Sequence, residues 1–212
     1  MKSLFKSVAL IFAALVVVAC SRQEPVIGQG AAVSPPLAEP ASSSDAVEVS
    51  ASSAPWYAER FEKLGFYVFP APEALPSFSV RTLKGAQVGV ADKAGKVLLL
   101  NFWATWCPPC RTEMPSIQVL SDKLKGAAFE VMAISVAEKP ETVAAFLKEN
   151  PYSFPIYLDE SGAASAPFAG RGIPTTFVLD KQGRAIAGLV GARSYDGPEV
   201  LGLFRELAER LP

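Results

Sequence analysis

The sequence predicts an α/β fold, in which helices flank a central sheet, from three observations. Two mainly apolar runs, within residues 96–105 and 129–136, are typical of central strands that are buried on both faces. A segment of helical composition follows each run, so strands and helices alternate along the chain. Short strand-like segments on either side of Gly85 and of Gly183 add one hairpin before and one after this alternation.

The individual elements are expected in the following order. A hairpin over residues 77–96 leads into the first buried strand, and residues 108–126 then form a helix. This helix tolerates two prolines in its first turn, should bend at Pro115 and should end at Gly126. The later elements are a strand at 129–136, helix at 139–150, strand at 154–159, hairpin at 173–191 and helix at 197–211. The last helix has five apolar residues on one face, namely Val200, Leu203, Phe204, Leu207 and Leu211.

Length and composition limit the possible functions. The chain has 212 residues, half of them hydrophobic, which is enough for one domain with a core plus an extension. The formal net charge is −1 and the basic residues are scattered, so the composition does not favour a nucleic-acid partner. The chain has three cysteines and no histidine. No metal site is expected, because structural zinc usually takes about four nitrogen or sulfur ligands.

The N-terminus has the pattern of a secretory signal. Lys2 and Lys6 precede an apolar run at residues 8–19, which is shorter than the roughly 20 residues that a membrane-spanning helix needs. The run ends in "VVAC", which resembles the cleavage site of bacterial lipoproteins, where the cysteine is lipidated. We therefore expect residues 1–19 to be a signal peptide and Cys20 to carry the lipid. An ordinary cleaved signal and an uncleaved anchor are the alternatives.

The next segment, residues 20–55, is rich in alanine, serine and proline and has few large apolar side chains. Such a segment cannot bury enough surface to offset the entropy lost on ordering, so we expect a disordered tether. Its reach would be about 35–40 Å for a flexible chain. Aromatic residues begin at Trp56, and residues 56–74 are expected to form an ordered arm or short helix. Residues 75–212 are expected to form the main domain.

The candidate active site is the Cys-Pro-Pro-Cys motif of Cys107 and Cys110. Cys107 falls where a buried strand meets the N-terminus of a helix, and the unpaired N–H groups there favour a thiolate. We therefore expect Cys107 to be the exposed, attacking sulfur and Cys110, one turn later, to be the resolving sulfur. A purely structural disulfide is the alternative, but so short a loop gives little stabilisation.

Two motifs together indicate a family. The stretches "FWATWCPPCRTEMP" (102–115) and "GIPTTFVLD" (172–180) resemble the TlpA/ResA-like branch of the thioredoxin superfamily, over about residues 75–211. The resemblance implies a thioredoxin fold, with a mixed central sheet and an N-terminal β-hairpin addition. It also implies a membrane-tethered thiol–disulfide oxidoreductase, usually a reductant in cytochrome c maturation or in the preparation of copper-site cysteines. Electrons would come from a membrane thiol carrier.

The resemblance also assigns roles around the cysteines. Pro174 corresponds to a cis-proline that lies against the active-site disulfide, and a cis bond would leave the backbone of Ile173 free to pair with an extended substrate. Trp106 corresponds to a tryptophan that offers apolar surface to the partner. The other residues expected to bind substrate are Pro108, Pro109 and Thr175.

One position departs from thioredoxin itself. Thioredoxin has an aspartate in the strand before the motif, which helps to move the proton of the resolving thiol, but Asn101 stands at the matching position here. ResA-like proteins instead use a glutamate after the next strand, and Glu138 matches it. A carboxylate partly buried near Cys110 would accept its proton. The alternative is that Glu138 is a solvated residue ahead of the next helix.

The sequence thus predicts a lipid-anchored periplasmic reductase of protein disulfides that needs neither metal nor organic cofactor. We expect the inner rather than the outer membrane, and no nucleic-acid partner. Three alternatives stay open, namely an oxidant that donates its disulfide, a Cu(I) carrier that uses both thiols, and a peroxidase of related fold. The three methionines are not clustered, which weakens the copper alternative.

Overall fold

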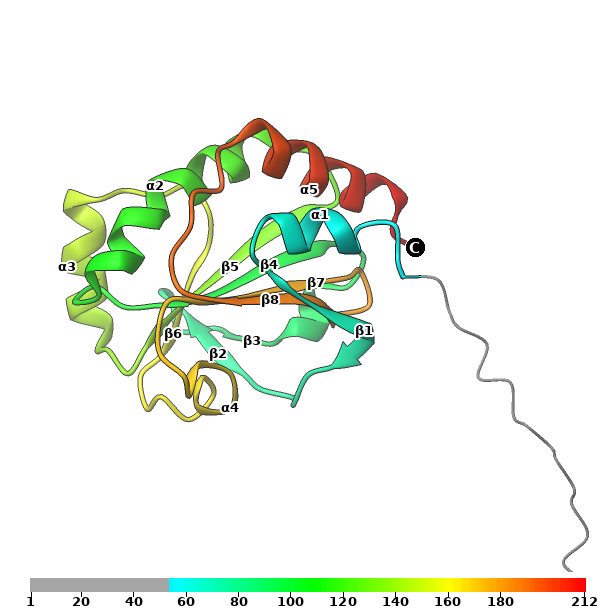
Figure 1. The fold of residues 1–212 in the computed structure, drawn as a ribbon. Coiled ribbons are helices and arrows are strands. Elements are labelled where there is room, and N and C mark those ends of the chain that lie inside the picture. The colour runs from blue at the N-terminus through cyan, green and yellow to red at the C-terminus, as the bar shows by residue number, and fades with distance from the viewer. Residues whose placement is uncertain (1–53) are drawn as a thin grey trace, which may run out of the picture. The chain divides into compact units, whose positions relative to one another are not determined.

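The structure is a computed structural model that describes residues 54–212, and Figure 1 shows their arrangement. The predicted signal peptide at residues 1–19, the lipidation residue Cys20 and nearly all of the tether at residues 20–55 lie outside the described residues. Within residues 54–212, no helix is both long enough and apolar enough to cross a membrane.

Eight strands form one mixed sheet in the order β1-β8-β7-β4-β5-β6-β2-β3. The strands are β1 (Tyr67–Ala74), β2 (Val80–Thr82), β3 (Gln87–Val88), β4 (Val97–Trp103), β5 (Phe129–Val136), β6 (Ile156–Asp159), β7 (Thr175–Leu179) and β8 (Arg184–Val190). The strands β4, β5 and β6 run parallel, whereas β7, β8 and β1 add to them as an antiparallel series.

Helices cover both faces of this sheet. The α-helices are α1 (Ala58–Lys63), α2 (Pro108–Lys123), α3 (Pro140–Glu149), α4 (Ala166–Ala169) and α5 (Pro198–Arg210), with a 3-10 turn η1 (Val90–Lys93). In Figure 1, α1, α2 and α5 lie on one side of the sheet and α4 on the other. The predicted α/β fold, with a mixed sheet flanked by helices, is therefore confirmed.

The central strand β4 places the cysteine motif. All seven of its residues are buried, and it is bonded to β5 on one side and to β7 on the other. Its side chains alternate between the two faces, so that Leu99 and Trp103 join the core under α2 and α5, while Leu98 and Leu100 join the core of the opposite face. The strand is thus fixed on all sides, and the loop at its end delivers Cys107 to the edge of the sheet.

Both predicted hairpins are present. In the first, β2 and β3 pair with Val80 opposite Val88, and Gly85 has φ of 88°, a conformation that glycine adopts without steric cost. Because β2 also pairs with β6, this N-terminal hairpin extends the sheet beyond the parallel strands. In the second, β7 and β8 meet through Gly183, which has φ of 77°.

The arm before the first hairpin contains more structure than its sequence suggested. Helix α1 buries Tyr57 and Phe61, and the ring of Phe61 lies 6.1 Å from that of Phe204 on α5. Strand β1 follows and pairs with β8 at the edge of the sheet. We expected an ordered arm or short helix over residues 56–74 and no strand. The prolines at 70 and 72 lack backbone donors, but an edge position with a bulge tolerates them.

Candidate active site

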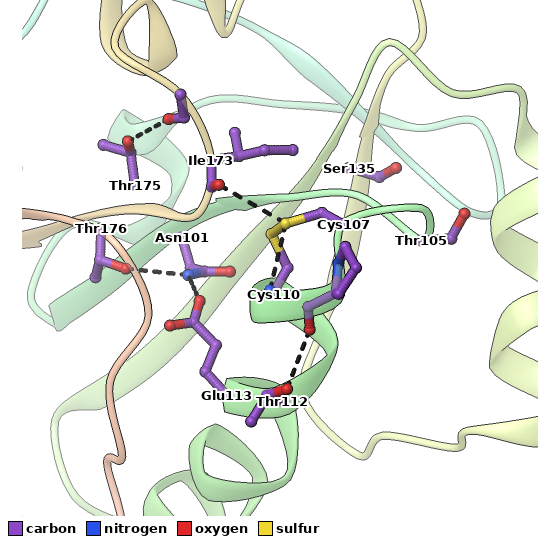
Figure 2. Close-up of a disulfide and its surroundings, with 12 residues drawn as sticks. Asn101, Thr105, Cys107, Cys110, Thr112, Glu113, Ser135, Ile173, Thr175 and Thr176 are labelled. Carbon is purple, nitrogen blue, oxygen red and sulfur yellow. Dashed lines mark hydrogen bonds between the residues drawn. A yellow bond between two sulfur atoms is a disulfide. The ribbon is translucent and has the colours of Figure 1, made fainter.

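Cys107 and Cys110 form a disulfide at the N-terminus of α2, as Figure 2 shows. Cys107 is the N-cap of the helix, in extended conformation, and its Cα lies 5.3 Å from that of Cys110. The loop after β4 brings the first sulfur to this position and the first helical turn brings the second. The two cysteines singled out by their spacing are therefore joined as predicted.

At the start of α2, one backbone N–H group donates a hydrogen bond to the sulfur of Cys107. Pro108 and Pro109 occupy the first two helical positions and have no N–H group. The N–H of Cys110 is consequently the first free amide of the helix, and it donates to Sγ of Cys107 at 3.3 Å. After reduction, this amide and the positive end of the helix dipole would both stabilise a thiolate at Cys107.

A second segment approaches the same sulfur from β7. The peptide bond between Ile173 and Pro174 is cis, as expected, and the carbonyl oxygen of Ile173 lies 3.7 Å from Sγ of Cys107. In the disulfide this is a contact without a proton, whereas a thiol at Cys107 could donate to the carbonyl. The hydroxyl of Thr175 donates to the carbonyl of Gly172 at 2.7 Å and so fixes the segment.

The cysteines are less accessible than we expected. Cys107 is only 2% exposed and Cys110 is fully buried, so the description of Cys107 as an exposed sulfur was wrong for the disulfide form. The Ile173–Pro174 segment and the first turn of α2 lie against the sulfurs and account for this.

The residues predicted to meet a partner lie in two groups beside the disulfide. Trp106, which is 66% exposed, stands before Cys107, and both Pro108 and Pro109 are exposed on the first turn of α2. On the other side, Ile173 is half-buried, but Thr175 is buried. The side chain of Thr175 therefore supports the segment, and its contact with a partner stays a prediction.

A buried carboxyl that sequence reasoning missed lies on α2 beside these groups. Glu113 is 2% exposed and stands one turn after Cys110. Its Oε1 accepts a hydrogen bond from Nδ2 of Asn101 at 2.8 Å, and its Oε2 accepts one from the backbone N–H of Arg193 at 3.3 Å. Burial raises the pKa of the Glu113 carboxyl from 4.5 to about 7, although both hydrogen bonds act in the opposite direction.

Asn101 connects this carboxyl to the region of the sulfurs. Its Nδ2 donates to both Glu113 and the hydroxyl of Thr176, the latter at 3.0 Å, whereas its buried Oδ1 has no hydrogen-bond partner. In Figure 2, the Asn101 oxygen is directed to the side where Cys110 lies. A buried acceptor without a donor is costly, and a thiol at Cys110 would supply a donor once the disulfide is reduced.

Glu138, the carboxylate proposed from sequence as proton acceptor, has different neighbours. It is 6% exposed, and its Oε2 accepts hydrogen bonds from the Thr105 N–H at 2.9 Å and from the Ser135 hydroxyl at 2.6 Å. Its Oε1 is hydrogen-bonded to the Thr105 hydroxyl. Glu138 is therefore not the solvated residue of the alternative interpretation. Its hydrogen bonds fix the loop just before Cys107, and none of them involves Cys110.

In the part of the chain that the structure describes, no cluster of three or more His, Cys, Asp or Glu residues is arranged to hold a metal ion. The described site contains a pair of cysteines joined as a disulfide, and its chemistry is that of a dithiol and its disulfide. A buried carboxyl of raised pKa and an unpaired amide oxygen accompany it.

Comparison with known proteins agrees with this geometry. The AhpC/TSA family model matches residues 72–186, more than half of the chain, including the disulfide and the cis-proline. The thiol–disulfide oxidoreductase ResA of a Bacillus cereus strain is 33% identical over 119 residues, which are 56% of this chain and 69% of ResA. The thioredoxin-like protein YneN of Bacillus subtilis is 41% identical over 112 residues, covering 51% of this chain and 64% of YneN.

Solved structures give the same result. A putative thiol:disulfide interchange protein DsbE from Chlorobium tepidum has a TM-score of 0.57 at 30% identity, covering 63% of this chain and 96% of that protein. A secreted thiol-disulfide isomerase from Corynebacterium glutamicum has a TM-score of 0.60 at 26% identity, with coverage of 68% and 92%. The chain therefore belongs to the AhpC/TSA family, has a thioredoxin-like fold, and is a thiol–disulfide oxidoreductase related to ResA.

Proposed function

We propose that this protein reduces disulfides of exported proteins while tethered by a lipid at Cys20 to the periplasmic side of a bacterial membrane. The observation that carries the redox part is the sulfur of Cys107, which receives the first free amide of α2 and lies against the Ile173 carbonyl. The signal-like N-terminus and the composition of residues 20–55 support the location and the tether.

The reaction uses the dithiol form. The thiolate of Cys107 attacks one sulfur of the partner disulfide, a bond forms between the two proteins, and the partner's other sulfur leaves as a thiolate. Cys110 then loses its proton and attacks Sγ of Cys107, which releases the second partner thiolate. Two electrons pass from the enzyme dithiol to the partner disulfide, and the enzyme is left with the Cys107–Cys110 bond of the structure.

The proton of Cys110 needs an acceptor, because a buried thiol does not ionise readily. We assign this role to the carboxyl of Glu113, whose pKa of about 7 leaves it about half ionised at neutral pH. Glu113 stands one helical turn after Cys110. Asn101 is bonded to Glu113 through Nδ2, and its unpaired Oδ1 could accept a hydrogen bond from the thiol and orient it, while the proton itself would pass to the carboxylate. Glu138, which sequence reasoning favoured for this role, would instead hold the loop that presents Cys107.

The partner would bind as an extended segment beside the cis-proline. The backbone of Ile173 offers hydrogen bonds to such a segment, and the exposed ring of Trp106 offers apolar surface next to the sulfur. Substrates of the cytochrome c or copper-site type, and a membrane thiol carrier as electron donor, are the partners that the resemblance to the TlpA/ResA-like branch favours. Such a partner must present its disulfide in a flexible or unfolded region to reach a sulfur that is nearly buried.

The direction of electron flow is tested by the reduction potential. Purified protein is equilibrated with glutathione buffers of graded ratio, and the oxidised fraction is measured from alkylation of the two thiols. A reductase is expected to have a potential close to that of thioredoxin, about −270 mV. A potential near −120 mV, the approximate value for a strong oxidant, would instead assign the protein as a disulfide donor.

A further inference from the structure

The side chain of Arg193 joins the N-terminal arm, defined as residues 56–66, to the loop between β8 and α5. Its guanidinium donates a hydrogen bond to the carbonyl of Leu64, and its Cζ lies 5.2 Å from the ring centroid of Phe66. The ring of Tyr195, two residues along the loop, lies 5.7 Å from the same carbon. One cation is thus held between an element at the start of the domain and a loop near its end.

The backbone of the same loop holds helix α2 beside the disulfide. The N–H of Arg193 donates to Oε2 of Glu113 at 3.3 Å, and the N–H of Tyr195 donates to the hydroxyl of Ser116 at 3.0 Å. The Tyr195 hydroxyl reaches Thr176, which also accepts from Asn101. The loop therefore completes a polar network around the Glu113 carboxyl.

Glu113 also borders a hollow of about 260 Å³, whose other lining residues are Thr112, Ala192, Arg193 and Ser194. Loop residues thus form one wall of the hollow beside Glu113. The position of the loop therefore affects the hydrogen bonding of the carboxyl.

We propose that Arg193 is a positioning residue for the redox reaction: by fixing the loop to the N-terminal arm, it keeps a backbone donor on the Glu113 carboxyl that accepts the Cys110 proton. The inference rests on the proposed function of Glu113. It adds that the N-terminal arm, which is far from the cysteines in sequence, supports the active site.

Two groups bond directly to the Glu113 carboxyl, namely Nδ2 of Asn101 on β4 and the N–H of Arg193 in the loop. Thr176 of β7, Ser116 of α2 and Tyr195 of the loop extend the same hydrogen-bond network. Burial raises the pKa of Tyr195, so it stays neutral at physiological pH. Arg193 is the cation among these described groups. If its anchor is lost, the carboxylate loses the backbone donor of Arg193, and this loss favours the protonated form.

The test follows how fast Cys110 resolves a mixed disulfide as a function of pH. The protein is loaded with a small thiol at Cys107, and release of that thiol is measured from pH 5 to 9. In full-length wild type, the rate of thiol release should change in a step with a midpoint near pH 7, and Glu113→Gln should remove this step. Arg193→Ala should move this step upward by at least about half a pH unit, since it weakens a hydrogen bond to a charged group.

Three further variants separate positioning from simple loss of structure. Arg205→Ala removes an exposed arginine of α5 that contacts the Lys123 carbonyl, and should leave the step in place. Phe66→Leu removes one ring beside the guanidinium without touching the loop, and should move the step in the same direction as Arg193→Ala. In the double variant Arg193→Ala/Glu113→Gln, the profile should match that of Glu113→Gln alone. Thermal unfolding of each variant checks that it is folded at the temperature of the rate measurements.

The possible outcomes distinguish the positioning role of Arg193 from the proton-acceptor role of Glu113. If Glu113→Gln removes the step but Arg193→Ala leaves it unmoved, the positioning role is wrong and the role of Glu113 stands. If Arg193→Ala still changes the profile when Glu113 is already glutamine, Arg193 acts by another route and the inference is also wrong. If wild type and Glu113→Gln have the same profile, the proposed function of Glu113 fails and this inference fails with it.

Discussion

Replacement of Cys107 by serine should lower the rate of disulfide reduction by about 10³-fold or more, because a hydroxyl at this position does not form the anion that attacks sulfur. The amide of Cys110 that now points at Sγ of Cys107 would face an oxygen that stays protonated at neutral pH. The measurement is the initial rate at which reduced variant and wild type cleave the disulfide of a model protein substrate.

Cys110→Ser is the matched variant, because it removes the second sulfur and keeps the backbone amide that serves Cys107. This variant should still attack but should accumulate a mixed disulfide with its partner, which non-reducing electrophoresis and mass spectrometry detect. When the full-length Cys110→Ser variant is expressed in a bacterial envelope, its mixed disulfides identify natural partners. If Cys107→Ser captured partners and Cys110→Ser did not, the two sulfurs would have the opposite roles.

Glu113→Gln should slow resolution of the mixed disulfide at neutral pH by at least about tenfold, because general base catalysis typically contributes about 10²–10⁴-fold. Glutamine has one acceptor oxygen, so it can keep the contact to Asn101 or the contact to Arg193 but not both, and it cannot accept a proton. The first attack by Cys107 does not use this carboxyl and should be nearly unchanged. Rapid-mixing measurements separate the two steps. Glu138→Gln is the comparison variant, because Glu138 is bonded to Thr105 and Ser135. This variant should show the same dependence of the resolution rate on pH as wild type.

The same substitution should change how stability depends on pH. The folded protein raises the pKa of Glu113 from 4.5 to about 7, so it binds the proton more tightly than the unfolded chain does. The contribution of this group is fully present below about pH 4.5 and is lost as the pH rises through about 7. The loss is about 3 kcal/mol for a shift of this size. The free energy of unfolding, measured with urea at pH 5 and at pH 8, should fall by most of this amount in wild type and should not fall in Glu113→Gln. An equal fall in both proteins would contradict the raised pKa of Glu113.

Local patterns were sufficient for the elements that carry the site. The mainly apolar runs that form β4 and β5 need two covered faces to be buried, and glycines with positive φ set both hairpin turns. Helix α2 follows from its prolines in the first turn and its helical composition. Strand β1 did not follow, because its pairing with β8 depends on an edge that only the assembled sheet provides.

The chemistry of the two carboxyls shows where sequence reasoning ends. Glu113 could have been noticed as a carboxyl on the helix face that also carries Cys110 and Ile117, both fully buried. Its partners Asn101 and Arg193, however, come from β4 and from a loop 80 positions away. For Glu138, its position along the chain correctly suggested burial near the motif. In the structure, however, its carboxylate accepts a hydrogen bond from Thr105, and no hydrogen bond joins it to Cys110.

The accessibility of Cys107 is a further property of the assembled fold. A cysteine at the start of a helix is commonly exposed, but here a segment 66 residues later lies against it through the Ile173 carbonyl. On the proposed function, a partner would therefore dock closely beside the cis-proline.

The central claim is that reduced Cys107 is ionised at neutral pH because α2 begins at its sulfur. The most direct measurement is the rate of iodoacetamide labelling of reduced Cys110→Ser from pH 4 to 10, with the unfolded variant as reference. We predict that labelling of folded Cys107 rises with a midpoint at least one pH unit below the value of about 8.5 for an ordinary thiol. A midpoint at or above that of the unfolded variant would contradict the account.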